Sequence, residues 1–233
     1  MIKVYYAKVF PHMEENTFFA HLNKIEKKRR QKILAGTNEK ARLRSLTAGS
    51  LLHDVLCREL GLFGENQPAF EFAYEKEGKP YLVRYPKLHF NLSHSGDYVC
   101  CAVGSTPVGT DIQKITKVKE GLARRFFTDK DNQNLASCSG EDREKLFFRM
   151  WSIKESYMKL TGRGMAEGLN TFEIDWQRNL ILEKSTDMSE AVAYFQEYGS
   201  LSQYCFCVCT KVKPQKVVWR ESSLSGITFL TDI

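Results

Sequence analysis

The sequence of 233 residues has no long apolar run, and no stretch approaches the roughly 18 consecutive apolar residues of a membrane-spanning helix. Residues 1–8 alternate like a β-strand and lack the apolar core of a signal peptide. Low-complexity segments and short-period repeats are missing as well. We therefore expect a cytoplasmic globular protein without membrane contact, and exclude collagen, coiled coil and wholesale disorder.

Zinc-binding spacings of cysteine and histidine are also missing. The chain has seven cysteines and five histidines, and they are not arranged as pairs that would close a tetrahedral site. Cys205, Cys207 and Cys209 alternate with apolar residues, so they share one face of a strand. We expect reduced thiols packed in a core.

Acidic residues are scarce in one segment. Residues 24–44 contain nine lysines and arginines but only two glutamates, while the whole chain carries a net charge of +6. Such a local excess indicates either a solvated helix face or an anionic partner: nucleic acid, a nucleotide, a phosphorylated cofactor or an acidic protein.

The order of the predicted elements favours an α+β fold. Apolar spacing predicts helices at 17–34, 39–60, 118–126, 129–136 and 141–161, and strands at 69–74, 81–83, 88–92, 98–103, 107–112, 171–176, 180–183, 191–197, 203–210 and 216–220. Each half thus reads as a long helix followed by an antiparallel meander. We predict two pseudo-symmetric subdomains, 1–103 and 104–233, each a long helix packed on an antiparallel sheet.

Two segments of the second half carry candidate metal ligands. In Val108–Gln113 (VGTDIQ), Asp111 and Gln113 lie on the same face of a short strand, and oxygen ligands suit Mg²⁺. In Trp151–Lys159 (WSIKESYMK), Trp151, Glu155 and Lys159 share one helix face. Taken alone, the first also fits a turn or cap and the second a surface ion pair.

Two segments of the first half contain polar groups suited to phosphate. His89–Gly96 (HFNLSHSG) ends a strand in small polar residues around a histidine, and offers hydroxyl, imidazole and backbone donors. Glu77–Pro80 (EGKP) is a turn with a lysine. A hairpin with a hydrogen-bonded histidine explains the first equally well by itself.

In their order along the chain and in their residues, these segments resemble the motifs of one family. Together with Arg44-Ser45-Leu46, they are similar to the Sfp-type 4′-phosphopantetheinyl transferases, which activate carrier proteins of fatty acid, polyketide and nonribosomal peptide synthesis. The family pattern (V/I)-G-(I/V)-D-x-(E/x), followed about forty residues later by W-(S/A/T)-x-K-E-(S/A)-x-x-K, is matched by 108–113 and 151–159, except that Thr110 replaces the usual Ile or Val. The patterns G-K-P and F-N-x-S-H-(S/T) are matched by 78–80 and 90–95.

The resemblance implies that coenzyme A, as co-substrate, binds between two pseudo-symmetric halves with Mg²⁺ on its pyrophosphate. By motif position, Asp111 and Glu155 would be metal ligands, and Lys159 and His94 would contact the pyrophosphate. Gln113 occupies a usually acidic position, and an amide is a poorer Mg²⁺ ligand than a carboxylate, so we expect it to act through water. The nucleotide end and its 3′-phosphate would be held by first-half residues: Arg29, Lys32, Arg44, Ser45, Lys79 and Ser93.

The resemblance also implies the reaction. A serine hydroxyl of an apo acyl, peptidyl or aryl carrier protein would displace 3′,5′-ADP at the β-phosphorus of coenzyme A. Glu155, or a water held by the metal, is the expected base, and Lys159 and His94 would stabilise the phosphoryl oxygens. Since two halves within one chain form the site, we expect a monomer.

The residues alone leave two other functions open. A non-enzymatic binder of RNA or an acidic protein would use residues 24–44, but this leaves Asp111 and Glu155 unexplained, and that segment lacks the interleaved aromatics of single-strand binders. A Mg²⁺-dependent phosphohydrolase would need further carboxylates for a second ion. The transferase is the leading expectation, with coenzyme A and a carrier protein as partners and no nucleic acid.

Overall fold

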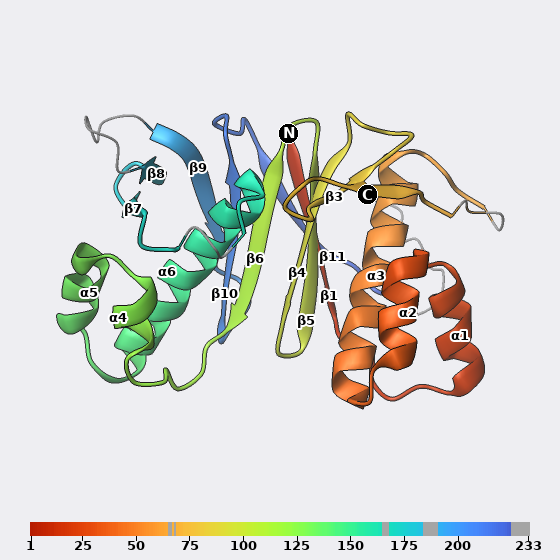
Figure 1. Cartoon of the computed structure of the whole chain (residues 1–233), viewed down its shortest axis with the longest axis horizontal. Helices are drawn as coiled ribbons and strands as arrows, with labels where there is room; N and C mark the ends of the chain where they lie inside the picture. Colours follow the sequence, from red (N-terminus) through yellow and green to blue (C-terminus); the bar gives the residue numbers. More distant parts are fainter. Residues whose placement is uncertain (65–66, 68, 165–167, 184–190, 225–233) are drawn as a thin grey trace.

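The computed structural model of the chain describes residues 1–64, 67, 69–164, 168–183 and 191–224, in which two β-sheets stand side by side with helices on their outer faces (Figure 1). In chain order the elements are β1 (Ile2–Lys8), α1 (Glu15–Asn23), α2 (Lys27–Ala35), α3 (Glu39–Glu59), β2 (Phe72–Tyr74), β3 (Pro80–Leu82), β4 (His89–Ser95), β5 (Tyr98–Gly104), β6 (Val108–Lys114), α4 (Leu122–Phe126), α5 (Asp129–Ala136), α6 (Gly140–Thr161), β7 (Phe172–Asp175), β8 (Leu180–Glu183), β9 (Ala191–Tyr198), β10 (Tyr204–Thr210) and β11 (Val217–Glu221).

The first sheet has the strand order β11-β1-β5-β4, and α3 packs against it. The apolar residues of α3 recur at helical spacing, so one side of the helix is buried against β1, β4 and β5. Asn38 caps the helix start by accepting a hydrogen bond from the backbone N–H of Ala41. The hairpin of β2 and β3 extends beside this layer.

The second sheet has the strand order β6-β10-β9-β8-β7 and is antiparallel throughout. Helix α6 packs on β6 and β10. The apolar core between the helix and this sheet includes Cys207 and Cys209. All seven cysteines are free thiols, and Cys205, Cys207 and Cys209 are buried, as expected from their alternation.

An apolar layer joins the two sheets. Residues from β1, β5, β6 and β10 form one buried cluster, so neither sheet presents this edge region to water. Strands β4 and β6 are the facing edges of the two sheets and lie next to each other in the middle of Figure 1. Their neighbourhood is therefore where residues from both halves meet.

The α+β expectation is confirmed, with two departures in detail. The single helix expected at 17–34 is two helices, because the Glu26 side chain accepts hydrogen bonds from the N–H groups of Lys28 and Arg29 and starts α2 afresh. The last strand does not extend the second meander: β11 returns to the first sheet and pairs in parallel with β1. Within the described segments, no helix is long and apolar enough to cross a membrane.

Gly109 sets the distance between α6 and β6. A Cβ at this position would lie 2.0 Å from the carbonyl oxygen of Ser156 and 2.4 Å from the backbone nitrogen of Leu160. Since both are backbone atoms of a helix, no side-chain rotation can make room. The strand and helix backbones can approach this closely only because residue 109 is glycine.

Replacing Gly109 with alanine is expected to push α6 away from β6. Overpacking of this kind costs roughly 1–3 kcal/mol of unfolding free energy, and a clash with backbone belongs at the upper end. Urea denaturation followed by circular dichroism measures the loss. Gly199→Ala is the control, because a Cβ there meets no atom within 4 Å. Equal urea midpoints for Gly109→Ala and Gly199→Ala would contradict the close contact between Gly109 and the α6 backbone.

Candidate functional site

Asp111 lies at the centre of the junction between the two halves. The residue is 1% exposed and lies mid-way along β6. Its Oδ1 atom accepts hydrogen bonds from Ser93 Oγ at 2.6 Å and Lys159 Nζ at 2.6 Å, and its Oδ2 atom accepts one from Gln113 Nε2 at 2.8 Å. A buried carboxylate needs such donors, because desolvation without them would be costly. Three residues of the predicted site thus meet on Asp111.

A row of side chains on β4 binds the edge of β6. The N–H of Thr110 donates to Asn91 Oδ1 at 3.0 Å, and that of Lys114 donates to Ser95 Oγ at 3.0 Å. Between them, the N–H of Ile112 makes a longer contact of 3.4 Å with Ser93 Oγ. No role was predicted for Asn91 or Ser95 from the sequence, although the polar residues at 91, 93 and 95 share one strand face and could have indicated it.

Helix α6 presents the other half of the site along one stripe. Trp151, Glu155 and Lys159 are half-buried, whereas their neighbours at 152–154, 156–158 and 160 are buried. The predicted common face is therefore confirmed. Lys159 Nζ donates to Ser93 Oγ at 2.9 Å as well as to Asp111, and so links α6 to both β4 and β6.

Glu155 is the second carboxylate of this cluster. Burial raises the pKa of Glu155, and the nearby Asp111 carboxylate raises it further, while Lys159 opposes this. Two carboxylates close together disfavour ionisation of both unless positive charge is supplied. Glu155 is therefore suited to accept either a proton or a cation.

A group of cations surrounds His94 at the end of β4. His94 is exposed, yet desolvation by the surrounding protein lowers the pKa of its imidazole, and Arg44, Lys159 and Arg29 lower it further. The buried Nε of Arg44 has no hydrogen-bond partner in the described part of the chain. Converging positive charge and an unused buried donor suit an anion such as phosphate.

Arg29 reaches this group from α2 because α3 has a glycine beneath it. A Cβ on Gly49 would approach Cδ of Arg29 to 3.0 Å, so the arginine stem lies against the α3 backbone. Burial lowers the pKa of Arg29, and Glu26 partly offsets this. Lys32 is exposed one turn later, and Ser45 is half-buried beside Arg44. In the described segments, neither Lys32 nor Ser45 hydrogen-bonds to the other site residues.

Lys79 connects the β2–β3 hairpin of the first half with the end of α6. Its Nζ donates to the carbonyl of Leu160 at 2.9 Å and lies 3.5 Å from that of Val108. Burial lowers the pKa of Lys79, and Lys211 lowers it further. Because Leu160 lies at the end of the helix, its carbonyl oxygen accepts no hydrogen bond from within the helix. The Lys79 ammonium supplies the missing donor and its positive charge suits the helix C-terminus.

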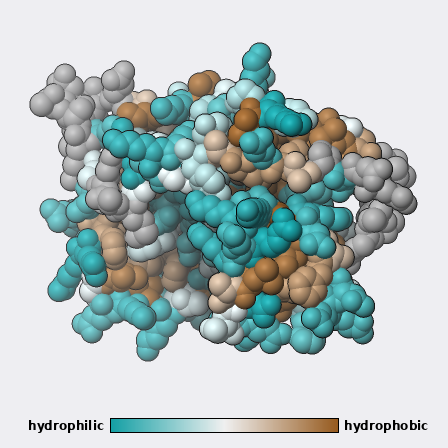
Figure 2. Space-filling view, turned by 45° about the vertical axis from the view of Figure 1, so that its right-hand side comes forward, coloured by the Kyte–Doolittle hydropathy of each residue, from teal (hydrophilic) through white to brown (hydrophobic). Residues whose placement is uncertain are grey.

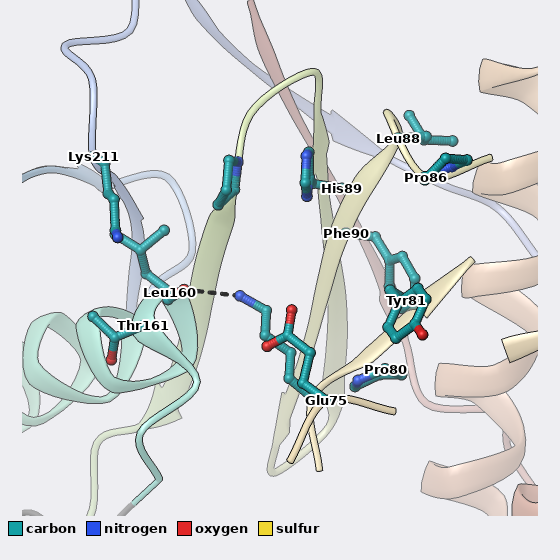
Figure 3. A pocket seen from close by; sticks show the side chains of 12 residues that line it. Glu75, Pro80, Tyr81, Pro86, Leu88, His89, Phe90, Leu160, Thr161 and Lys211 are labelled. Carbon is teal, nitrogen blue, oxygen red and sulfur yellow. Dashed lines mark hydrogen bonds between the residues drawn. The ribbon is translucent and has the colours of Figure 1, made fainter. Parts of the chain in front are cut away.

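An open pocket of about 400 Å³ lies beside Lys79. Figure 3 shows Leu160, Thr161 and Lys211 of the second half facing Glu75, Tyr81 and Phe90 of the first. Burial and the neighbouring Lys79 lower the pKa of His89, which also lines the pocket. The pocket combines apolar walls with basic groups, as sites for charged small molecules commonly do.

Lys154, next to Glu155 in sequence, points into the core. It is completely buried and pairs with Asp131 of α5 at 2.9 Å. Its Nζ also donates to the carbonyls of Leu169 at 2.9 Å and Phe172 at 2.8 Å. No role was predicted for Lys154 from the sequence. In the structure Lys154 anchors α6, which fixes the orientation of the half-buried stripe on the adjoining face.

The donor set fits a hard cation that brings further ligands with it. Within the described residues, no three His, Cys, Asp or Glu side chains form a metal-binding group, and Asp111 and Glu155 are two carboxylates. Mg²⁺ typically takes one or two protein carboxylates and completes its shell with water and substrate phosphates. The site therefore suits a cation shared with a phosphate-bearing ligand.

The chain is similar to known proteins along most of its length. The family model described as the 4′-phosphopantetheinyl transferase superfamily matches residues 107–209, and the model of the 4′-phosphopantetheinyl transferase N-terminal region matches residues 11–106. The 4′-phosphopantetheinyl transferase psf-1 of Bacillus pumilus is 38% identical over 168 residues, 70% of each chain. The chain belongs to the 4′-phosphopantetheinyl transferase family.

Further relatives extend the match. The 4′-phosphopantetheinyl transferase gsp of Aneurinibacillus migulanus is 30% identical over 89% of this chain and 85% of its own length. The 4′-phosphopantetheinyl transferase Sfp of Bacillus subtilis strain 168 is 29% identical over 84% of this chain and 85% of its own. The predicted Sfp-type resemblance is confirmed, the protein is a transferase, and the two alternative functions lose their support.

Within this transferase, the Lys79 bridge is expected to contribute to stability. Lys79→Met retains the apolar stem but removes the donor to Leu160, and one hydrogen bond contributes about 1 kcal/mol. We expect a lower urea midpoint. Lys76→Met, on the same hairpin but exposed, should stay close to wild type. If Lys79→Met matched Lys76→Met, the bridge would contribute nothing to the fold.

Proposed function

We propose that the protein transfers the 4′-phosphopantetheine group of coenzyme A to a serine hydroxyl of an apo acyl, peptidyl or aryl carrier protein, releasing 3′,5′-ADP in a Mg²⁺-dependent reaction. The observation that carries this proposal is the cluster of Asp111, Ser93 and Lys159 beside Glu155, built from both halves. Family membership supplies the reaction class.

In this proposal, residues 1–103 form the nucleotide side of the site. The 3′-phosphate would be held by the cations around His94, where the buried Arg44 Nε lacks an acceptor within the described segments. Lys32 and Ser45 lie on the same elements, α2 and α3, and would complete this grip. The pocket beside Lys79 has the walls and basic groups that suit the rest of the nucleotide.

Residues 104–233 would supply the metal ligands and the catalytic helix. Asp111 and Glu155 would hold Mg²⁺ together with the pyrophosphate, and the bound ion would neutralise charge on the leaving group. Gln113 hydrogen-bonds to Asp111 through its amide nitrogen, which supports orientation of that carboxylate in place of direct metal binding. The separate contributions of the two halves favour a monomer.

The chain's own residues suit the displacement at the β-phosphorus. As the serine oxygen forms its bond to phosphorus, the bond to the bridging oxygen breaks, and 3′,5′-ADP leaves with the electron pair. Glu155 would take the serine proton, a role that its raised pKa favours. Lys159 and His94 would stabilise charge on the phosphoryl oxygens.

The carrier protein would meet a mixed surface. Figure 2 shows hydrophilic side chains gathered in the middle of one face with hydrophobic patches beside them. In the second half, Arg124 and Arg125 of α4 are exposed, whereas Phe126 is half-buried against Trp151 and Phe127 is core. Exposed arginines suit an acidic carrier. A cytoplasmic location, where carriers and coenzyme A are found together, accords with this role.

The function is tested by incubating the protein with coenzyme A, Mg²⁺ and several apo carrier proteins. We expect each accepted carrier to gain the mass of phosphopantetheine, measured by intact mass spectrometry. Removal of the metal with a chelator should stop the gain, because the pyrophosphate charge would then be unbalanced. No gain with any carrier would refute the transfer, and undiminished gain with chelator would refute the metal.

Glu155→Gln is expected to abolish transfer, because the amide can neither accept the serine proton nor bind the metal as a carboxylate does. The rate of mass gain should fall by about 10²-fold or more. Glu141→Gln changes an exposed carboxylate on the same helix and should leave the rate unchanged. Near-normal turnover by Glu155→Gln would remove Glu155 from the mechanism.

A further inference from the structure

We propose that Lys159 and the divalent cation compete for Asp111, so that metal binding and coenzyme A binding are coupled through the displacement of one ammonium group. The inference rests on the proposed function and concerns this chain's own residues. Lys159 Nζ lies 2.6 Å from Asp111 Oδ1 and 2.9 Å from Ser93 Oγ. It therefore occupies the side of the carboxylate that faces α6, the helix that carries Glu155.

The contacts of Asp111 leave little room for an added cation. Oδ1 accepts from both Ser93 and Lys159, and Oδ2 accepts from the Gln113 amide. Gln113 is neutral and can rotate its amide, so it obstructs a metal only weakly. The ammonium of Lys159 is charged, and in this buried surrounding it repels a divalent cation on either oxygen. Metal binding to the protein alone is thus opposed mainly by Lys159.

Lys159 is not fully enclosed beside Asp111. Its side chain is 27% exposed, and it acts electrostatically on His94 together with Arg44 and Arg29. The ammonium therefore acts both on the two carboxylates and on the cation group proposed to bind phosphate. When pyrophosphate is present, Lys159 gains an anionic partner at the moment it gives up Asp111. Binding of the divalent cation therefore strengthens binding of coenzyme A, and coenzyme A strengthens binding of the cation by the same factor.

The test measures binding of Mn²⁺ to the whole protein, with free Mn²⁺ followed by electron paramagnetic resonance at constant ionic strength. Mn²⁺ alone should bind Lys159→Gln about fivefold or more tightly than wild type, the lower end of typical coupling between sites. Coenzyme A should tighten Mn²⁺ binding to wild type by a larger factor than to Lys159→Gln. Lys159→Met is measured in parallel, so that the result does not depend on one variant.

Two variants control for charge. Lys159→Arg keeps a cation beside Asp111 and should bind Mn²⁺ alone as weakly as wild type. Lys114→Gln removes a cation from the same strand, where Lys114 pairs with Asp97 at 2.8 Å, and should not alter Mn²⁺ affinity. Asp111→Asn should lose the Mn²⁺ site, which shows that the measured site is the one proposed.

Equal or weaker binding of Mn²⁺ to Lys159→Gln and Lys159→Met would overturn the proposal. So would tightening by Lys159→Arg or Lys114→Gln to the same extent, since the effect would then be unspecific, and so would an equal effect of coenzyme A on wild type and Lys159→Gln. The proposed function fails separately: if wild type transfers no phosphopantetheine while Mn²⁺ alone binds Lys159→Gln more tightly, the reaction is refuted and the competition for Asp111 stands.

Discussion

The alignment of β4 beside β6 is the interaction on which the site depends. The two strands belong to different sheets, and hydrogen bonds from β6 backbone groups to Asn91, Ser93 and Ser95 set their register. Ser93 thereby faces Asp111, and His94 is carried on the same strand to the cation group. Because side chains make this connection, the edge strand β6 is covered without extending the sheet, and its polar groups become part of a site.

The close approach of α6 to β6 is the second feature that the site requires. Gly109 admits the helix backbone closely, and Lys154 holds the opposite face of the helix to Asp131 in the core. These contacts fix the distance of the helix from β6 and its rotation about its own axis, so that Glu155 and Lys159 are held near Asp111. Residues with no chemical role thus determine where the chemical groups lie, as expected when a site requires accurate positioning.

The sequence predicted most elements and the stripe of α6, since both depend on local periodicity. It also singled out Asp111, Ser93 and Lys159, although the contacts among them required three separate elements to meet. Three features escaped prediction for physical reasons. The break at Glu26 depends on a cap, the return of β11 depends on long-range pairing, and the burial of Lys154 depends on acceptors supplied by a distant loop. The last two depend on contacts that no local pattern encodes, and the first escaped because glutamate is not among the usual N-cap residues.

Groups of like charge lie close together at two places in the site, and a charged ligand would explain why. Desolvation by the surrounding protein and three neighbouring cations disfavour protonation of His94, and burial beside Asp111 disfavours ionisation of Glu155. Cations thus gather around His94 and two carboxylates lie together at Glu155, and Lys159, which contacts the Asp111 carboxylate, acts electrostatically on both groups. A ligand that brings anionic phosphates together with a divalent cation would relieve both at once, whereas either ion alone would relieve only one. The first half, with 16 basic and 11 acidic residues up to residue 103, carries most of the net positive charge, and this excess would favour the phosphates of the proposed ligand.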